Sequence, residues 1–121
     1  MKQFLILFRE ADGRAGTHQP EEIQRHQQNW QQWIEQQSTA GKWIGGSPLT
    51  LTGATINTDQ HIHNGLYAIG TEIVGGFIIL HAASLEEATA IAQTCPIFEF
   101  DGYAEVREMI FPGIPVPGKT S

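Results

Sequence analysis

The sequence has little of what secretion, membrane insertion or disulfide bonding requires. Cys95 is the single cysteine among 121 residues, so no disulfide can form within the chain, and we expect a reducing, cytoplasmic location. The apolar run at residues 4–8 is about half as long as the core of a signal peptide. We therefore expect neither a secretion signal nor a membrane span.

Positive charge is also scarce. Lys and Arg number 7 against 13 Asp and Glu, and the resulting net charge of −6 opposes attraction to nucleic acid or anionic lipid. We expect neither as a partner. Apolar residues make up 40% and charged residues 17% of the chain, which is typical of a globular protein. We predict one domain over residues 1–110, followed at 111–121 by a proline-containing tail that is extended or disordered.

Two segments have the pattern of strands covered on both faces. Residues 3–9 and 72–82 carry apolar side chains at successive positions, so both alternating faces are apolar. A looser strand region begins at residue 42, and a last strand is expected over residues 103–110. The pairs Gly45-Gly46 and Gly75-Gly76 indicate bulges, or places where another group approaches the backbone.

Two helices are expected between these strands. Pro20 opens the first, which should run to about Thr39 and end at Gly41 in a left-handed conformation. Its apolar stripe includes one histidine and is made by Ile23, His26, Trp30, Trp33 and Ile34. Ser84 and Glu87 form a capping box for the second helix, which Pro96 ends. Asn64-Gly65 predicts a tight turn between strand ends.

The resulting order, β-α-β-(hairpin)-β-α-β, is that of an α+β ferredoxin-like sandwich with both helices on one sheet face. The opposite face is also apolar and needs a cover. Two such sheets packed around a two-fold axis would bury these faces, so we predict a homodimer that forms a dimeric α/β barrel.

Over roughly residues 2–110 the chain resembles the YCII-related, or DGPF-domain, proteins. Asn64-Gly65-Leu66-Tyr67 stands where that family has Asp-Gly-Pro-Phe, and Glu72 precedes a Gly-Gly-aromatic stretch. The resemblance implies a dimeric α/β-barrel fold similar to that of muconolactone isomerase, with a histidine and an aspartate as catalytic pair. His26 matches the histidine. Asn64 replaces the aspartate, and an amide cannot act as a carboxylate base.

The candidate site therefore centres on His26, an acid or base near neutral pH or else a hydrogen-bonded core histidine. Glu72 is the retained acid that could take the place of the lost aspartate; otherwise it lies in solvent. We predict a ligand cavity beside His26 that is bounded by Trp30, Gly45, Gly46, Asn64, Gly65 and Tyr67. The simpler interpretation makes Trp30 a core residue and Asn64-Gly65 only a turn.

Other polar residues are weaker candidates for a functional site. His61 and His63 share one strand face with Asp59, but these three residues are an incomplete ligand set, so we expect no bound metal. We also expect no cofactor. Arg9 and Arg107 either bind an anion or pair with nearby carboxylates. We expect Cys95 to be a small core residue.

Two functions remain open from the sequence. One is a small-molecule enzyme of isomerase or lyase type that transfers a proton through His26. The alternative is a non-catalytic ligand-binding or dimeric assembly domain that has lost the signature aspartate.

Overall fold

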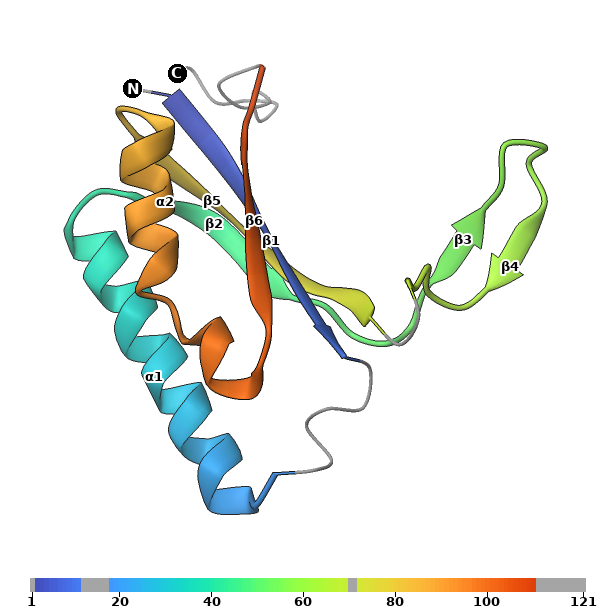
Figure 1. Cartoon of the computed structure of the whole chain (residues 1–121), viewed down its shortest axis with the longest axis horizontal. Coiled ribbons are helices and arrows are strands. Elements are labelled where there is room, and N and C mark those ends of the chain that lie inside the picture. The colour runs from blue at the N-terminus through green and yellow to red at the C-terminus, as the bar shows by residue number, and fades with distance from the viewer. Residues whose placement is uncertain (1, 12–17, 70–71, 111–121) are drawn as a thin grey trace, which may run out of the picture.

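The computed structural model describes residues 2–11, 18–69 and 72–110, so the predicted tail at 111–121 lies outside the described residues. Two helices, a 3₁₀ turn and six strands follow one another along the chain (Figure 1). In order they are β1 (Lys2–Ala11), α1 (Pro20–Thr39), β2 (Trp43–Pro48), β3 (Ala54–Ile56), β4 (Ile62–Asn64), β5 (Glu72–Ala82), α2 (Leu85–Gln93), η2 (Pro96–Phe100) and β6 (Tyr103–Glu108).

The main sheet has the strand order β2-β5-β1-β6, and each neighbouring pair is antiparallel. β1 and β2 are consequently parallel, with β5 between them, and α1 connects them across one face. Figure 1 shows α2 on that same face, so both helices cover one side of the sheet. This arrangement confirms the predicted α+β ferredoxin-like fold, with β1 and β5 at the centre of the sheet.

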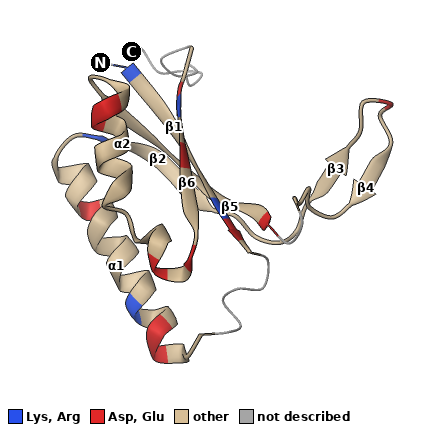
Figure 2. Ribbon diagram, viewed as in Figure 1, with Lys and Arg blue, Asp and Glu red and all other residues tan. Residues whose placement is uncertain are grey.

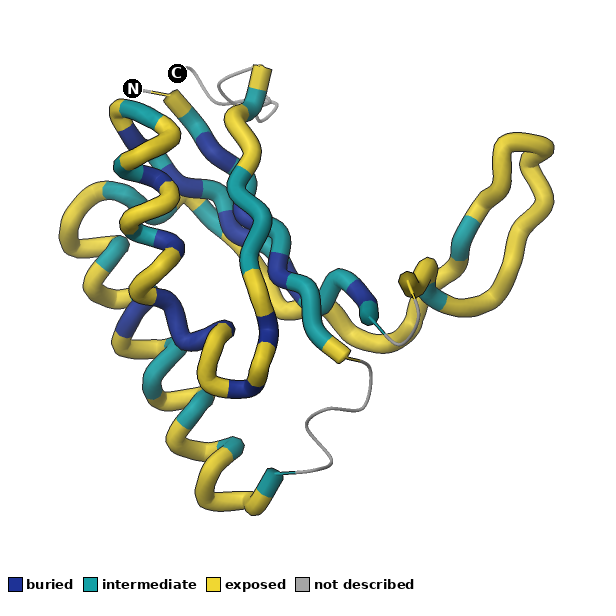
Figure 3. Tube along the Cα trace, in the orientation of Figure 1, coloured by how far each residue is buried: buried dark blue, intermediate teal, exposed yellow. Residues whose placement is uncertain are grey.

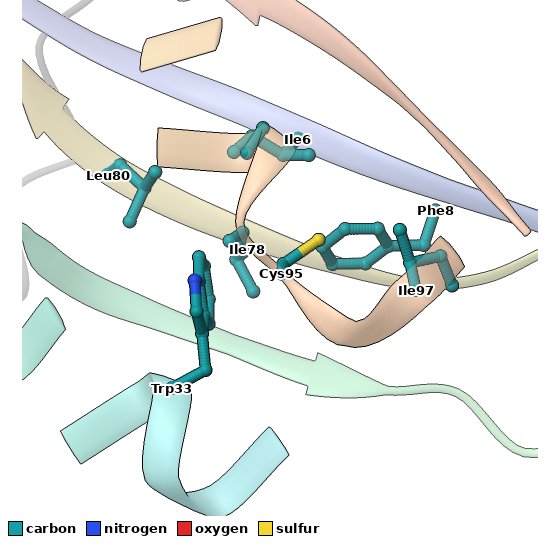
Figure 4. Close-up of a cluster of buried hydrophobic side chains, with 8 residues drawn as sticks. Ile6, Phe8, Trp33, Ile78, Leu80, Cys95 and Ile97 are labelled. Atoms are coloured by element: carbon teal, nitrogen blue, oxygen red, sulfur yellow. The ribbon is translucent and has the colours of Figure 1, made fainter. Parts of the chain in front are cut away.

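The core lies between the helices and the sheet. β1 alternates strictly, so Phe4, Ile6 and Phe8 point at the helices and are buried. Ile78 and Leu80 of β5 join them from the neighbouring strand, and Trp33 enters from the middle of α1 (Figure 4). Figure 3 shows that burial is concentrated along the central strands and the adjoining faces of the helices.

Polar contacts tie the two helices to each other and tie α2 to the residue that precedes β2. The Trp33 indole N–H donates to Thr94 Oγ1 at 2.8 Å, which joins α1 to the end of α2. Lys42, just after α1, pairs with Glu87 in the first turn of α2 at 2.7 Å. The hydrogen bond from Lys42 lowers the pKa of the Glu87 carboxyl below its usual value.

The predicted helix ends are confirmed. Gly41 adopts φ 74° just after α1, and the Ser84 hydroxyl accepts a hydrogen bond from the Glu87 N–H at the start of α2. α1 begins at Pro20, where the Glu22 carboxylate accepts the Gln19 N–H at 3.2 Å. Among the described residues, no helix combines the length and the apolar side chains needed to cross a membrane.

Both glycine pairs sit at irregularities of the sheet, as expected. The pairing of β2 with β5 shifts between Trp43 and Gly45, and a Cβ at Gly46 would lie 2.5 Å from the Phe77 carbonyl oxygen. The pairing of β1 with β5 shifts after Phe8, and the Glu10 carboxylate occupies the space where a Cβ of Gly75 would be. The approaching groups are parts of the protein itself: a strand backbone and an acidic side chain.

The expected hairpin between the second and the central strand exists, but its turn is not at Asn64-Gly65. The chain reverses at residues 57–61, where the Gln60 N–H donates to the Asn57 carbonyl and Gln60 takes φ 69°. Asn64 instead ends β4, opposite Ala54. Asn-Gly pairs favour turns by local conformation alone, and here the cross-strand pairing of Ile56 with Ile62 sets the register.

The second face of the main sheet carries Leu5 and Leu7 on β1 opposite Ile79 and Phe77 on β5. All four are half-buried, and the structure contains one chain, so a homodimer that covers this face stays a prediction. Charged side chains border the apolar strip, because Arg9 and Arg107 both lie 3.5 Å from Glu105.

Ile6 should be a strong determinant of stability. Its side chain is fully buried between sheet and helices, whereas Ile110 is 91% exposed. We expect Ile6→Ala to lower the free energy of unfolding by about 2–5 kcal/mol, because the lost methyl groups leave a cavity. The matched control Ile110→Ala should change it by less than about 0.5 kcal/mol. Equal midpoints for both variants in urea denaturation would contradict this core assignment.

Cys95 should be chemically inert in the folded protein. Its side chain belongs to the core cluster, which confirms the expected core role, and burial raises the pKa of the thiol to about 11. Since only the thiolate is nucleophilic, Ellman's reagent at pH 8 should react at least about 100-fold more slowly with the native chain than with the urea-unfolded chain. Comparable rates in both states would show an accessible thiol.

Candidate active site

A cavity of about 660 Å³ lies between the inner face of α1 from Ile23 to Glu35, η2 and the sheet. Most of its wall is apolar and aromatic, with Phe8, Trp30, Trp43 and Phe100 among the lining residues. The polar side chains that line it are Glu10, His26, Gln27, Gln31, Glu35 and Ser47. The predicted cavity beside His26 and Trp30 is therefore present, and its volume is in the range of small-molecule sites.

Aromatic rings hold the imidazole of His26 in one plane. The Phe100 ring stacks on it with centroids 4.2 Å apart and planes 18° apart. His18 stacks on Phe100 as well, at 3.8 Å, and Trp30 meets His26 edge-on at 6.2 Å. Trp30 in turn packs edge-on against Phe8 of β1 at 5.2 Å. Ring packing thus connects the imidazole to the sheet through Trp30.

Both ring nitrogens of His26 have a protein partner. Nδ1 lies 2.8 Å from Glu99 Oε1, and Nε2 lies 3.0 Å from the indole nitrogen of Trp30. An indole N–H can only donate, so Nε2 must carry the lone pair. The proton of the neutral ring is then on Nδ1 and is donated to Glu99. With its side chain 14% exposed, His26 is a hydrogen-bonded histidine in one defined tautomer.

Glu99 is itself held in place. Its second oxygen accepts a hydrogen bond from Asn29 Nδ2 at 2.8 Å, while its first faces His26. Glu99 lies in η2, and Asn29 lies on α1, three residues after His26. Sequence reasoning missed both residues. Glu99 is 73 positions from His26 along the chain, so no local spacing relates the two.

Glu72 is not the carboxylate that His26 contacts, contrary to the sequence-based expectation. It begins β5 opposite Ala11, and its carboxylate accepts the hydrogen bond of the Tyr103 hydroxyl from β6. That hydrogen bond raises the pKa of Tyr103. The other acid considered from the sequence, Asp59, bonds His61 instead.

The signature segment also lies elsewhere than predicted. Gly46 lines the cavity together with Trp30, but Gly45, Asn64, Gly65 and Tyr67 are absent from its wall. Asn64 ends β4, and the β3–β4 hairpin points away from the main sheet (Figure 1). Within one chain, the hairpin forms a separate two-stranded sheet, so it cannot bring these residues to His26.

The remaining candidates have structural partners. Arg9 pairs with Glu105 rather than lining the cavity. His61 bonds Asp59 at 2.7 Å, and His63 bonds Asn57 at 2.8 Å. Across residues 2–11, 18–69 and 72–110, no group of three His, Cys, Asp or Glu side chains is arranged to hold a metal ion.

Residues 3–111 match the YCII-related domain, so the chain belongs to that family. No curated protein matches. Among solved structures, the chain is similar to 5-chloro-2-hydroxyhydroquinone dehydrochlorinase from Burkholderia phenoliruptrix, solved in complex with 2,5-dihydroxybenzoquinone. The TM-score is 0.49 and the identity is 20%, over 85% of this chain and 90% of that one.

The tautomer of His26 is directly measurable. In the wild-type protein we expect long-range ¹H–¹⁵N correlation of the neutral ring to show the proton on Nδ1, because Trp30 donates to Nε2 and Glu99 accepts from Nδ1. Trp30→Phe together with Glu99→Gln should abolish that preference. The exposed His61, whose side chain is 79% accessible, is the internal reference in the same spectrum. A wild-type ring protonated on Nε2 would contradict the assigned hydrogen bonds.

Proposed function

We propose that the protein is a small-molecule enzyme that moves a proton within a bound ligand through His26. One observation supports this proposal above the others: a single histidine both lines the cavity and has a carboxylate as hydrogen-bond partner. His26 lines the cavity, and Glu99 lies 2.8 Å from its Nδ1. A histidine held by a carboxylate is a common acid–base unit, because the carboxylate orients the ring and stabilises the imidazolium.

The hydrogen bonds of the ring favour Nε2 as the reactive atom. Nδ1 faces Glu99, so Nε2 is the nitrogen that would accept a proton from a ligand. The Trp30 indole N–H donates to that lone pair, so a ligand O–H or C–H must replace the indole to reach it. The ligand proton then moves to Nε2, and the positive charge on the ring is balanced by Glu99.

The second half of the reaction returns the proton. When the electron pair left on the ligand shifts along a conjugated system, protonated His26 can deliver the same proton to a different atom, which completes an isomerisation. When the electron pair instead expels a leaving group from the neighbouring carbon, the result is an elimination. General acid–base catalysis of this kind contributes about 10²–10⁴-fold to a rate.

The cavity wall suggests the class of ligand. Aromatic and aliphatic side chains provide most of the surface, with a few carboxamides and carboxylates among them. Such a wall suits a compact molecule with a flat apolar body and a small number of polar groups, whose acidic proton is directed at His26.

A second candidate function is ligand binding without chemistry. It is favoured by the fact that both ring nitrogens of His26 already have hydrogen-bond partners within the protein, as in a structural histidine. Asn64 in place of the family's aspartate also favours it. The two functions share the cavity and differ in whether the ligand displaces Trp30 from Nε2.

Deuterium incorporation separates the two functions. Ligands are first found as compounds that raise the melting temperature, since binding to the folded state stabilises it by mass action. Each hit is then incubated with the protein in D₂O and analysed by mass spectrometry. We expect one carbon-bound hydrogen to exchange, at a rate reduced about 10²-fold or more by His26→Gln and less by Glu99→Gln.

The matched control is His61→Gln, a histidine outside the cavity, which should leave the exchange rate unchanged. Hits that bind without exchanging would favour the non-catalytic domain. Exchange that survives His26→Gln would exclude His26 as the base. The absence of any stabilising compound would count against both functions.

A further inference from the structure

The hydrogen bond between Trp30 and His26 covers the reactive nitrogen of the site. The Trp30 indole nitrogen lies 3.0 Å from His26 Nε2, and both side chains line the cavity. A ligand that reaches Nε2 therefore takes the acceptor away from the indole N–H. A partly buried donor that loses its acceptor weakens binding by about tenfold or more, unless the ligand supplies a replacement.

Ring packing limits how far Trp30 can move when a ligand enters. Its ring packs edge-on against Phe8 of β1 at 5.2 Å and against Trp33 at 5.7 Å. Trp33 is itself held by its hydrogen bond to Thr94. The indole N–H therefore stays beside Nε2, and a ligand atom that bonds Nε2 from the cavity also lies within reach of the indole.

A hydroxyl group can satisfy both partners of the broken hydrogen bond. It has one O–H to donate to His26 Nε2, and it has two lone pairs, one of which can accept the indole N–H of Trp30. An ether or carbonyl oxygen has no proton for Nε2, and a C–H or ammonium group has no lone pair for the indole. A hydroxyl is therefore the simplest ligand group that replaces both ends of the hydrogen bond.

Proton transfer strengthens the contact with Trp30. When the O–H proton moves to His26 Nε2, a negative charge remains on the ligand oxygen, and a hydrogen bond to an ionised oxygen is about twice as strong as one to a neutral oxygen. The charge on the imidazolium is balanced by Glu99, whose carboxylate lies 2.8 Å from Nδ1. The indole N–H thus stabilises the ionised ligand more than the neutral ligand, as donors in oxyanion sites do.

The described part of the cavity wall offers the ligand oxygen no full positive charge. Its lining residues include Glu10 and Glu35 but no Lys or Arg. In Figure 2 the turn η2, which borders the cavity, carries red acidic positions and no blue ones. A negative ligand oxygen must therefore be held by neutral donors and by the proton on His26, and the Trp30 indole is the neutral donor that lies beside Nε2.

We propose that Trp30 contacts the ligand as a hydrogen-bond donor to its ionised oxygen, and that the ligand presents a phenol or enol hydroxyl to His26 and Trp30. This inference rests on the acid–base role proposed above and adds the group that gives the proton. A hydroxyl on an unsaturated carbon is acidic enough to be ionised by a positioned base, since the phenol of tyrosine ionises near about pH 10. The flat body of such a molecule also suits the aromatic wall.

The bonds balance without a further reactant. The ligand O–H bond breaks and an Nε2–H bond forms on His26. The electron pair on the oxygen then forms a C=O bond, and the adjacent C=C pair takes the proton from Nε2 as a new C–H bond. The sequence is an isomerisation of an enol to a ketone, during which Trp30 donates to the same oxygen throughout.

4-Nitrophenol tests the proposal, because its phenol and phenolate forms absorb at different wavelengths. At a pH where the free compound is mostly the phenol, we expect the compound bound to the wild type to absorb as the phenolate. Trp30→Phe should lower the ratio of bound phenolate to bound phenol about tenfold, and His26→Gln should abolish the bound phenolate. The matched control is Trp43→Phe, since Trp43 lines the same cavity and both nitrogens of His26 have other partners. It should weaken both forms equally and leave the ratio unchanged.

A second measurement needs no substitution and decides the matter if Trp30→Phe does not fold. In a ¹H–¹⁵N spectrum of the wild type, the indole N–H resonance of Trp30 should move downfield as 4-nitrophenol is added, because its hydrogen bond to an ionised oxygen is stronger. The indole of Trp33, bonded to Thr94 Oγ1 at 2.8 Å, is the internal reference and should not move. 4-Nitroanisole, the methyl ether, has no proton to give and should cause no downfield shift.

Several results would overturn the proposal. They are an unchanged phenolate ratio in Trp30→Phe, an equal loss in Trp43→Phe, a Trp30 resonance that does not respond, and failure of 4-nitrophenol to bind at its solubility limit. The outcome is separate from that of the deuterium experiment. Trp30-dependent bound phenolate without hydrogen exchange in any ligand would support this role of Trp30 and remove the isomerase, whereas exchange confined to ligands without a hydroxyl would do the reverse.

Discussion

Trp33 packs against the centre of the sheet from the middle of α1, and its indole N–H is bonded to Thr94 at the end of α2. This one side chain therefore sets how close the first helix lies to β1 and β5 and anchors it to the second helix. Beside Trp33, the face of α1 from Ile23 to Glu35 lines a cavity together with η2 and the glycine-containing parts of β2 and β5. The position of Trp33 thus determines that His26, two turns earlier, faces a space that a ligand can enter.

The network around His26 depends on that helix position. Trp30, one turn before Trp33, contacts Phe8 of the sheet and donates to His26 Nε2. Glu99 and Asn29 complete the network from η2 and α1. Because the indole can only donate, the imidazole has one tautomer, and its basic nitrogen is the one whose indole partner forms part of the cavity wall. A structural hydrogen bond and the proposed acid–base role thus use the same lone pair at different stages.

On the side away from the helices, no element of the described chain covers the apolar side chains. The helices protect one face of the sheet, while the second face and the β3–β4 hairpin both carry apolar side chains. A chain with few positive charges and a net charge of −6 repels copies of itself at long range, so the predicted homodimer would have to form through uncharged patches. The open strip of β1 and β5, made by Leu5, Leu7, Ile79 and Phe77, is such a patch.

Local patterns in the sequence determined the secondary structure and most of the fold. Apolar alternation located β1 and β5, Pro20 and Gly41 bounded α1, the capping box of Ser84 began α2, and the order of these elements implied the sandwich. Each of these signals acts over a few residues, so it determines the local backbone conformation without contacts from distant parts of the chain. His26 was likewise placed on the inner face of α1 by helical phase.

The tertiary structure alone decided which groups meet. Glu99 contacts His26 because η2 packs against α1. Glu72 accepts the hydrogen bond of Tyr103 because β5 and β6 lie on either side of β1. The hairpin register was set by cross-strand pairing of Ile56 and Ile62, which carried Asn64 and Gly65 away from the cavity. Contacts between residues far apart in the chain depend on the relative placement of whole elements, and no local periodicity encodes that placement.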